Sequence, residues 1–86
     1  MNGGIKLAYY ERKDWDRFLQ MIDDKDKMHD TWQEWYIAFE KLENELERQG
    51  FIVKRVAVDI DELNYYCKIR GIKNDGKARS DFVMKK

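Results

Sequence analysis

The sequence contains no proline, only one cysteine and no long apolar run. The single cysteine, Cys67, excludes an intramolecular disulfide and a cysteine-rich zinc site. No run of uncharged residues is longer than five, which argues against a membrane span and a signal peptide, so we expect a cytoplasmic protein with no membrane contact. Because no proline blocks a strand edge, pairing of strand edges or packing of exposed helix stripes could join two copies into a homodimer.

What is present indicates a folded domain. The chain of 86 residues is 43% hydrophobic, 14% aromatic and 40% charged, which favours one small globular domain over residues 1–86 rather than a disordered chain. Large aromatic rings contribute much apolar area per residue and suit a small core. The first four residues, "MNGG", are predicted to form a disordered tail.

The net charge is zero but unevenly distributed. Residues 11–50 hold twelve acidic and seven basic residues, whereas residues 68–86 hold two acidic and seven basic residues. The basic end could fold back onto the acidic helices, of this chain or of a second copy, or it could contact an anionic partner. We favour the first interpretation, because a neutral chain lacks the long-range field typical of nucleic-acid binders.

Hydrophobic periodicity predicts the order β-α-α-β-α-α. Residues 5–10 and 51–59 are rich in strand-forming residues, and helical spacing is found in residues 15–22 and 32–49. Two shorter helices are predicted between Asp59 and the end of the chain. The prediction is a predominantly helical α+β fold, with a two-stranded sheet covered by helices over one face.

The clearest predicted element is the helix over residues 32–49. Thr31 and Glu34 have the spacing of a capping box, and Gly50 followed by Phe51 is typical of a Schellman ending. Glu43 falls within the apolar stripe of this helix. A catalytic role for Glu43 remains open, but we favour pairing with a base such as Lys54 or Arg55, since no second acid or nucleophile accompanies it.

Similar signals divide the C-terminal segment into two helices. Asp59 or Asp61 is expected to cap the first, which ends at Gly71 with Ile72 folding back on Cys67. Asp75 is expected to cap the second. A carboxylate at that cap would occupy the N–H groups that a phosphate needs, which argues against a phosphate-binding loop.

No pattern indicates an enzyme or a cofactor. Asp59, Asp61 and Glu62 cluster where a strand meets a helix and could hold magnesium, although acids in a first helical turn are also what the helix dipole favours. His29 and Cys67 could form a base and nucleophile, but a thiol on an inward helix face is more typical of a small core residue.

The basic C-terminal helix pair, residues 67–86, raises the alternative of nucleic-acid binding. Its spacing partly resembles a helix-turn-helix, but polar residues stand where the second helix should bury aliphatic ones. Phosphate contact without sequence reading remains open for five cations: Lys73, Lys77, Arg79, Lys85 and Lys86.

The run from "MHDTWQEW" through "DIDELNYYCKIRGIKNDGKARSDFV" resembles a group of small, stand-alone bacterial proteins carried as conserved hypotheticals. The resemblance covers about two-thirds of the chain and implies a bacterial cytosolic source. It implies no activity and transfers no functional residues. We therefore expect a non-enzymatic interaction or regulatory module with an unidentified protein partner, and we keep nucleic-acid association as the alternative.

Overall fold

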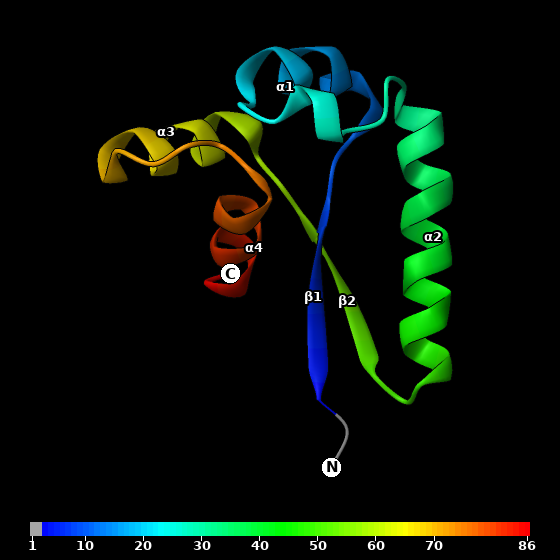
Figure 1. Ribbon diagram of the computed structural model, residues 1–86. Helices are drawn as coiled ribbons and strands as arrows, with labels where there is room; N and C mark the ends of the chain where they lie inside the picture. Colours follow the sequence, from blue (N-terminus) through cyan, green and yellow to red (C-terminus); the bar gives the residue numbers. More distant parts are fainter. Residues whose placement is uncertain (1–2) are drawn as a thin grey trace.

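The computed structural model describes residues 3–86 and contains the predicted order of helices and strands (Figure 1). This confirms the α+β, predominantly helical fold. Two short 3-10 turns, η1 and η2, flank the first helix. The elements are β1 (Gly4–Tyr9), η1 (Arg12–Asp14), α1 (Trp15–Met21), η2 (Lys25–Lys27), α2 (Trp32–Arg48), β2 (Ile52–Ala57), α3 (Ile60–Arg70) and α4 (Gly76–Met84).

The two strands pair in parallel, with Lys6 beside Lys54 and Ala8 beside Val56. A parallel pair requires a crossover connection, which the segment containing α1 and α2 provides. Figure 1 shows α2 on one side of the strands and α4 on the other, with α1 across one end. This confirms that helices cover the sheet, and the cover extends over both faces, as is usual for parallel strands.

The aromatic side chains at the end of β1 and just after it contact different helices. Tyr9 faces α2, where its ring centroid lies 5.8 Å from those of Trp35 and Phe39. The next residue, Tyr10, stacks on Phe18 of α1 at 4.2 Å. The buried hydrophobic core comprises Tyr10, Trp15, Phe18, Ile22, Trp35, Phe39, Val58, Ile60, Leu63, Cys67, Ala78, Phe82 and Val83.

Helix α2 begins and ends as its sequence predicts. The Thr31 hydroxyl accepts from the Glu34 N–H, and the Glu34 carboxylate accepts from the Thr31 N–H, which completes the capping box. Gly50 has φ = 96°, and the Phe51 N–H donates to the Leu46 carbonyl in the Schellman pattern. The side chain of Glu43 accepts two hydrogen bonds from Arg55, at 2.7 and 2.8 Å. This confirms the predicted pairing and gives the inward-facing carboxylate a structural role.

The last two helices also have the predicted ends. The Asp59 carboxylate caps α3 by accepting from the N–H groups of Asp61 and Glu62. Gly71 ends this helix in the left-handed conformation, with φ = 62°, and the Ile72 N–H donates to the Cys67 carbonyl. Asp75 caps α4 by accepting from the Ala78 N–H. Both C-terminal helices are therefore fixed by local signals.

The N-terminal prediction requires one correction. Gly4 is the first residue of β1 and the Gly3 carbonyl accepts from the Ile52 N–H, so these two residues belong to the sheet and not to a disordered tail. Residues 1–2 lie outside the described part of the chain. Over residues 3–86, no helix combines the length and the apolar character needed to cross a membrane.

Candidate protein-interaction site

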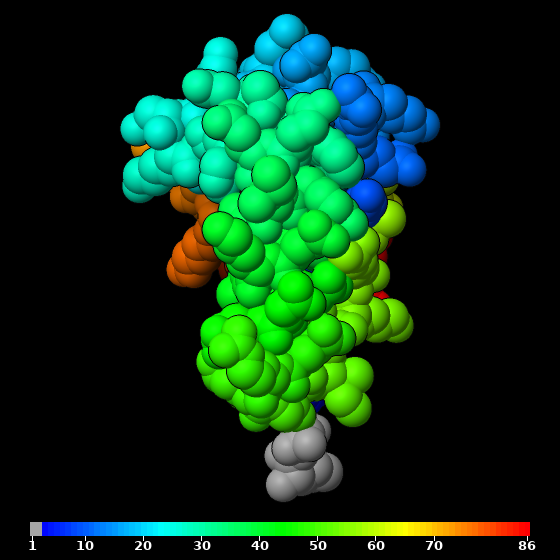
Figure 2. Space-filling view, turned by 90° about the vertical axis from the view of Figure 1, so that its right-hand side faces the viewer, coloured from blue at the N-terminus to red at the C-terminus, as the bar shows by residue number. Residues whose placement is uncertain are grey.

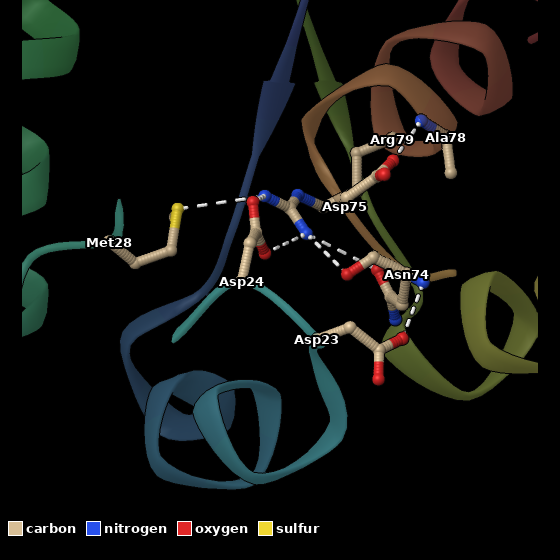
Figure 3. Close-up of polar contacts among 7 residues, drawn as sticks. All are labelled: Asp23, Asp24, Met28, Asn74, Asp75, Ala78 and Arg79. Carbon is tan, nitrogen blue, oxygen red and sulfur yellow. Dashed lines mark hydrogen bonds and ion pairs between the residues drawn. The ribbon is translucent and has the colours of Figure 1, made fainter. Parts of the chain in front are cut away.

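Of the five predicted anion-contacting cations, Arg79 is buried in the fold (Figure 3). Its guanidinium donates to both carboxylate oxygens of Asp24, at 2.9 and 2.7 Å, and to the backbone carbonyl of Asn74 at 3.1 Å. Only 7% of the Arg79 side chain and 14% of the Asp24 side chain are exposed. The prediction that Arg79 contacts an external anion is therefore wrong, because its charge is already neutralised inside the protein.

This ion pair belongs to a network that joins the two halves of the chain. The Asp23 N–H donates to the Asn74 carbonyl at 2.9 Å, and the Asn74 N–H donates to the Asp23 carboxylate at 2.7 Å. The loop after α1 is thereby fixed to the loop before α4. The basic end does fold back onto the acidic segment, at Asp24 and Arg79.

The network changes the acidity of two groups. Hydrogen bonds from Arg79 lower the pKa of Asp24 below its usual 3.8, against the opposing effect of burial. Burial raises the pKa of Tyr10 to about 12, and the nearby Arg79 offsets this only in part. At neutral pH the shifts favour an ionised Asp24 and a neutral Tyr10.

The other four predicted cations do not form one surface. Lys73 and Lys77 line a shallow cleft that also contains Asp75 and Asp81. Lys85 donates to the Tyr66 hydroxyl at 3.2 Å, and Lys86 pairs with Glu62 on α3. The predicted contact residues are thus divided between two regions and the core.

The three carboxylates considered for magnesium binding each have a different partner in the protein. Asp59 caps α3, Asp61 pairs with Arg17 at 2.7 Å, and Glu62 pairs with Lys86. Among residues 3–86, no group of three or more His, Cys, Asp or Glu side chains could hold a metal ion. Within residues 3–86 these acids therefore do not form the alternative magnesium site, and Asp59 has the capping role that we favoured.

The environments of His29 and Cys67 also argue against the alternative of a base and nucleophile pair. Cys67 is 3% exposed within the core, and burial raises the pKa of its thiol. His29 is exposed in the loop before α2. Cys67 thus has the environment of a small core residue.

The outer edge of β1 has unpaired backbone groups. The Ile52 N–H donates to the Gly3 carbonyl and the Val58 N–H donates to the Tyr9 carbonyl. In a parallel ladder every second residue bonds to the partner strand, so Leu7 and Tyr9 direct their N–H and C=O groups toward β2. Lys6 and Ala8 direct theirs away from it, and no described residue bonds to them.

Lys6, Leu7 and Ala8 line a cleft with an accessible volume of about 330 Å³. One wall is α2, which contributes Ala38 and Leu42, and the other is α4, which contributes Gly76 and Ser80. Figure 2 shows α2 as a green ridge along the molecule, with the first part of α4 in orange beside it. An unpaired strand edge between two helical walls has the geometry that accepts an added strand.

The opposite edge of the sheet lacks this enclosure. By the same alternation, Val53, Arg55 and Ala57 direct their backbone groups away from β1. The cleft nearest to this edge contains Ala57 alone of β2 and is lined mainly by charged residues, including Glu11, Lys13 and Arg17. The two edges therefore differ in surroundings although both are unpaired.

Comparison of the chain with protein-family models, with curated proteins and with solved structures gave no match. The function proposed below consequently depends on the geometry of the molecule.

Proposed function

We propose that the chain is a non-enzymatic protein-interaction module that binds an extended segment of a partner protein along the free edge of β1. The observation that carries the proposal is the outward-facing backbone of Lys6 and Ala8, two residues that line the cleft between α2 and α4. An added strand would satisfy these donors and acceptors, and the cleft walls would contact its alternating side chains. A bound helix would not, since its backbone groups already bond to one another.

A segment of another protein fits this edge better than a second copy. Helix α4 lies against β1. If β1 paired with β1 of a second copy, the two strands would lie about 4.8 Å apart. The two α4 helices packed on them would then be brought closer than the distance of about 8–10 Å between axes that packed helices need. We therefore favour a partner protein over a second copy at this edge, and the experiment must be able to detect a homodimer.

The experiment compares two Ala→Pro variants at opposite edges of the same sheet. In Ala8→Pro the proline ring replaces an outward N–H of β1 and projects into the cleft, without removing a bond to β2. In Ala57→Pro the same change is made at the outer edge of β2. Each variant is used for nuclease-treated affinity purification from the native cell, after circular dichroism has shown that it is folded.

We expect a protein that is recovered with the wild type and Ala57→Pro but lost with Ala8→Pro. Recovery of the same partners with all three proteins would overturn the proposal. Light scattering of the purified protein measures its oligomeric state. If the wild type is a dimer and Ala8→Pro is a monomer, the β1 edge binds a second copy of the chain and not a partner protein.

One observation favours nucleic acid as a second candidate. Tyr65 on α3 is 65% exposed, and it lines a cleft of about 280 Å³ with Arg70, Lys85 and Lys86. An exposed ring beside cations is the arrangement that stacks single-stranded bases and contacts phosphates. Two of these cations already have partners within the protein, which weakens the case for nucleic acid. The Arg70 guanidinium lies 3.8 Å from the Tyr66 ring centroid, and Lys86 pairs with Glu62.

Titration with single-stranded DNA and RNA over a range of salt concentrations tests this candidate. Binding through this surface should weaken steeply with salt and should fall in a Lys85→Ala, Lys86→Ala double variant. The matched control is a Lys73→Ala, Lys77→Ala double variant, which removes two charges from another region. Absent or salt-insensitive binding would exclude nucleic acid as the partner.

As part of the same proposal we place the protein in a bacterial cytoplasm. The free and buried Cys67 supports this location, because unpaired thiols are common in reducing compartments.

A further inference from the structure

We infer that the segment bound at the edge of β1 is acidic and apolar, with a carboxylate beside Lys6 and a large apolar side chain beside Ala8. This inference rests on the proposed function and adds the chemistry of the partner. It follows from three neighbouring positions of β1, each of which has a different environment.

The Lys6 position requires a negative charge. Lys6 lies beside Lys54 in the sheet register, so the two ammonium groups are on the same face. Neither lysine forms an ion pair with any described residue. In an added strand, the residue opposite Lys6 would point to this face too, where a carboxylate forms a favourable cross-strand pair and a cation is repelled.

The cleft itself contains no compensating acid. Its charged or titratable lining residues are Lys6, Tyr10, His29 and Arg79, without any carboxylate. Arg79 is neutralised by Asp24, which leaves Lys6 as the unpaired permanent charge of the cleft. The charge that the partner has to supply is therefore negative and located at one end of the strand edge.

The Leu7 position requires an apolar neighbour. Leu7 points to the same face as Tyr9, toward α2. On that wall Leu42 is 48% exposed and Ala38 lines the cleft beside it. An apolar side chain opposite Leu7 would cover this exposed surface of α2.

The Ala8 position has space for a large side chain. Ala8 points to the opposite face, toward α4, where the small residues Gly76 and Ser80 line the cleft together with Arg79 and Val83. A Cβ added at Gly76 would meet nothing within 4 Å. The partner segment therefore has the pattern acidic, apolar, large apolar, read in the direction from Lys6 to Ala8.

Short blocked peptides test this pattern. They have Glu, Gln or Lys at the position opposite Lys6, followed by the same apolar residue opposite Leu7 and the same large apolar residue opposite Ala8. NMR titration of the full-length protein measures their affinities. We expect the Glu peptide to bind roughly 1.5- to 5-fold more tightly than the Gln peptide, and the Lys peptide to bind most weakly. Lys6→Glu should reverse this order, whereas Lys73→Glu, an exposed lysine outside the cleft, should leave it unchanged.

The outcomes separate the inference from the proposed function. If the peptides bind equally and Ala8→Pro abolishes binding, the acidic preference is wrong and the strand-binding function stands. If binding persists in Ala8→Pro, the peptides do not occupy the β1 edge and the proposed function is wrong. Absence of binding by every peptide at millimolar concentration would contradict both.

Discussion

Arg79 and Asp24, 55 positions apart in the sequence, form a bidentate ion pair that is almost completely removed from solvent. Bidentate pairs between arginine and a carboxylate fix orientation as well as distance. This pair, with the two hydrogen bonds between Asp23 and Asn74, holds the start of α4 against the loop after α1. It therefore sets the position of one wall of the β1 cleft.

Breaking this pair should destabilise the protein strongly. Asp24→Asn leaves the Arg79 charge buried without a counter-charge, and we expect a loss of about 3 kcal/mol in the free energy of unfolding, measured by urea denaturation. Asp61→Asn is the control, since Arg17 and Asp61 are 56% and 68% exposed and their pair should contribute less than about 1 kcal/mol. A similar loss in both variants would contradict the structural role of the buried pair.

The same pair should make stability depend on acidity. The pKa of Asp24 is lower in the folded protein than its usual 3.8, so its stabilising effect is present above pH 3.8 and is lost as the pH falls through the folded pKa. The difference in unfolding free energy between the wild type and Asp24→Asn should therefore shrink in acid. Urea titrations over a pH series measure it, and a difference independent of pH would show that Asp24 does not titrate as described.

Tyr10 should ionise only at high pH. Its folded pKa of about 12 lies above the usual 10, so the stability that it contributes is complete below pH 10 and is lost as the pH rises toward 12. Of the five tyrosines in the chain, one should give a late tyrosinate absorbance step that Tyr10→Phe removes. Tyr65→Phe, at an exposed position, should leave that step in place.

The two C-terminal glycines should respond in opposite ways to alanine. Gly71 has φ = 62°, so Gly71→Ala should lower the unfolding free energy by about 1 kcal/mol. Gly76 begins α4 without a positive φ and with open space around it, so Gly76→Ala should be neutral or stabilising. Thermal unfolding of both variants measures the contrast, and equal shifts would contradict the assigned backbone conformations.

Most local structure of this protein could be predicted from the sequence. The capping box at Thr31, the glycine endings and the Asp75 cap all depend on side chains within a few residues of the helix end, so local patterns suffice to identify them. The pairing of Glu43 with Arg55 could also be predicted, because a carboxylate within an apolar stripe needs a nearby base.

Long-range features could not be predicted in the same way. Arg79 was expected on the surface because it belongs to a segment rich in basic residues, and only the tertiary fold brings Asp24 to it. The strands were expected, but their parallel direction and the backbone alternation at Lys6 and Ala8 depend on how the chain crosses over. The imbalance between acidic and basic segments was the one signal of this long-range contact.

The most direct test of the strand-binding account is residue-resolved amide hydrogen exchange along β1. In the free protein, Leu7 and Tyr9 should be protected by their bonds to β2, while Lys6 and Ala8 exchange rapidly. With the affinity-purified partner or the Glu peptide present, we expect the Lys6 and Ala8 amides of the wild type to become protected. The Lys6 amide should also become protected in Ala57→Pro, but it should stay in rapid exchange in Ala8→Pro. Binding that leaves the Lys6 and Ala8 amides in rapid exchange would contradict the strand-binding account.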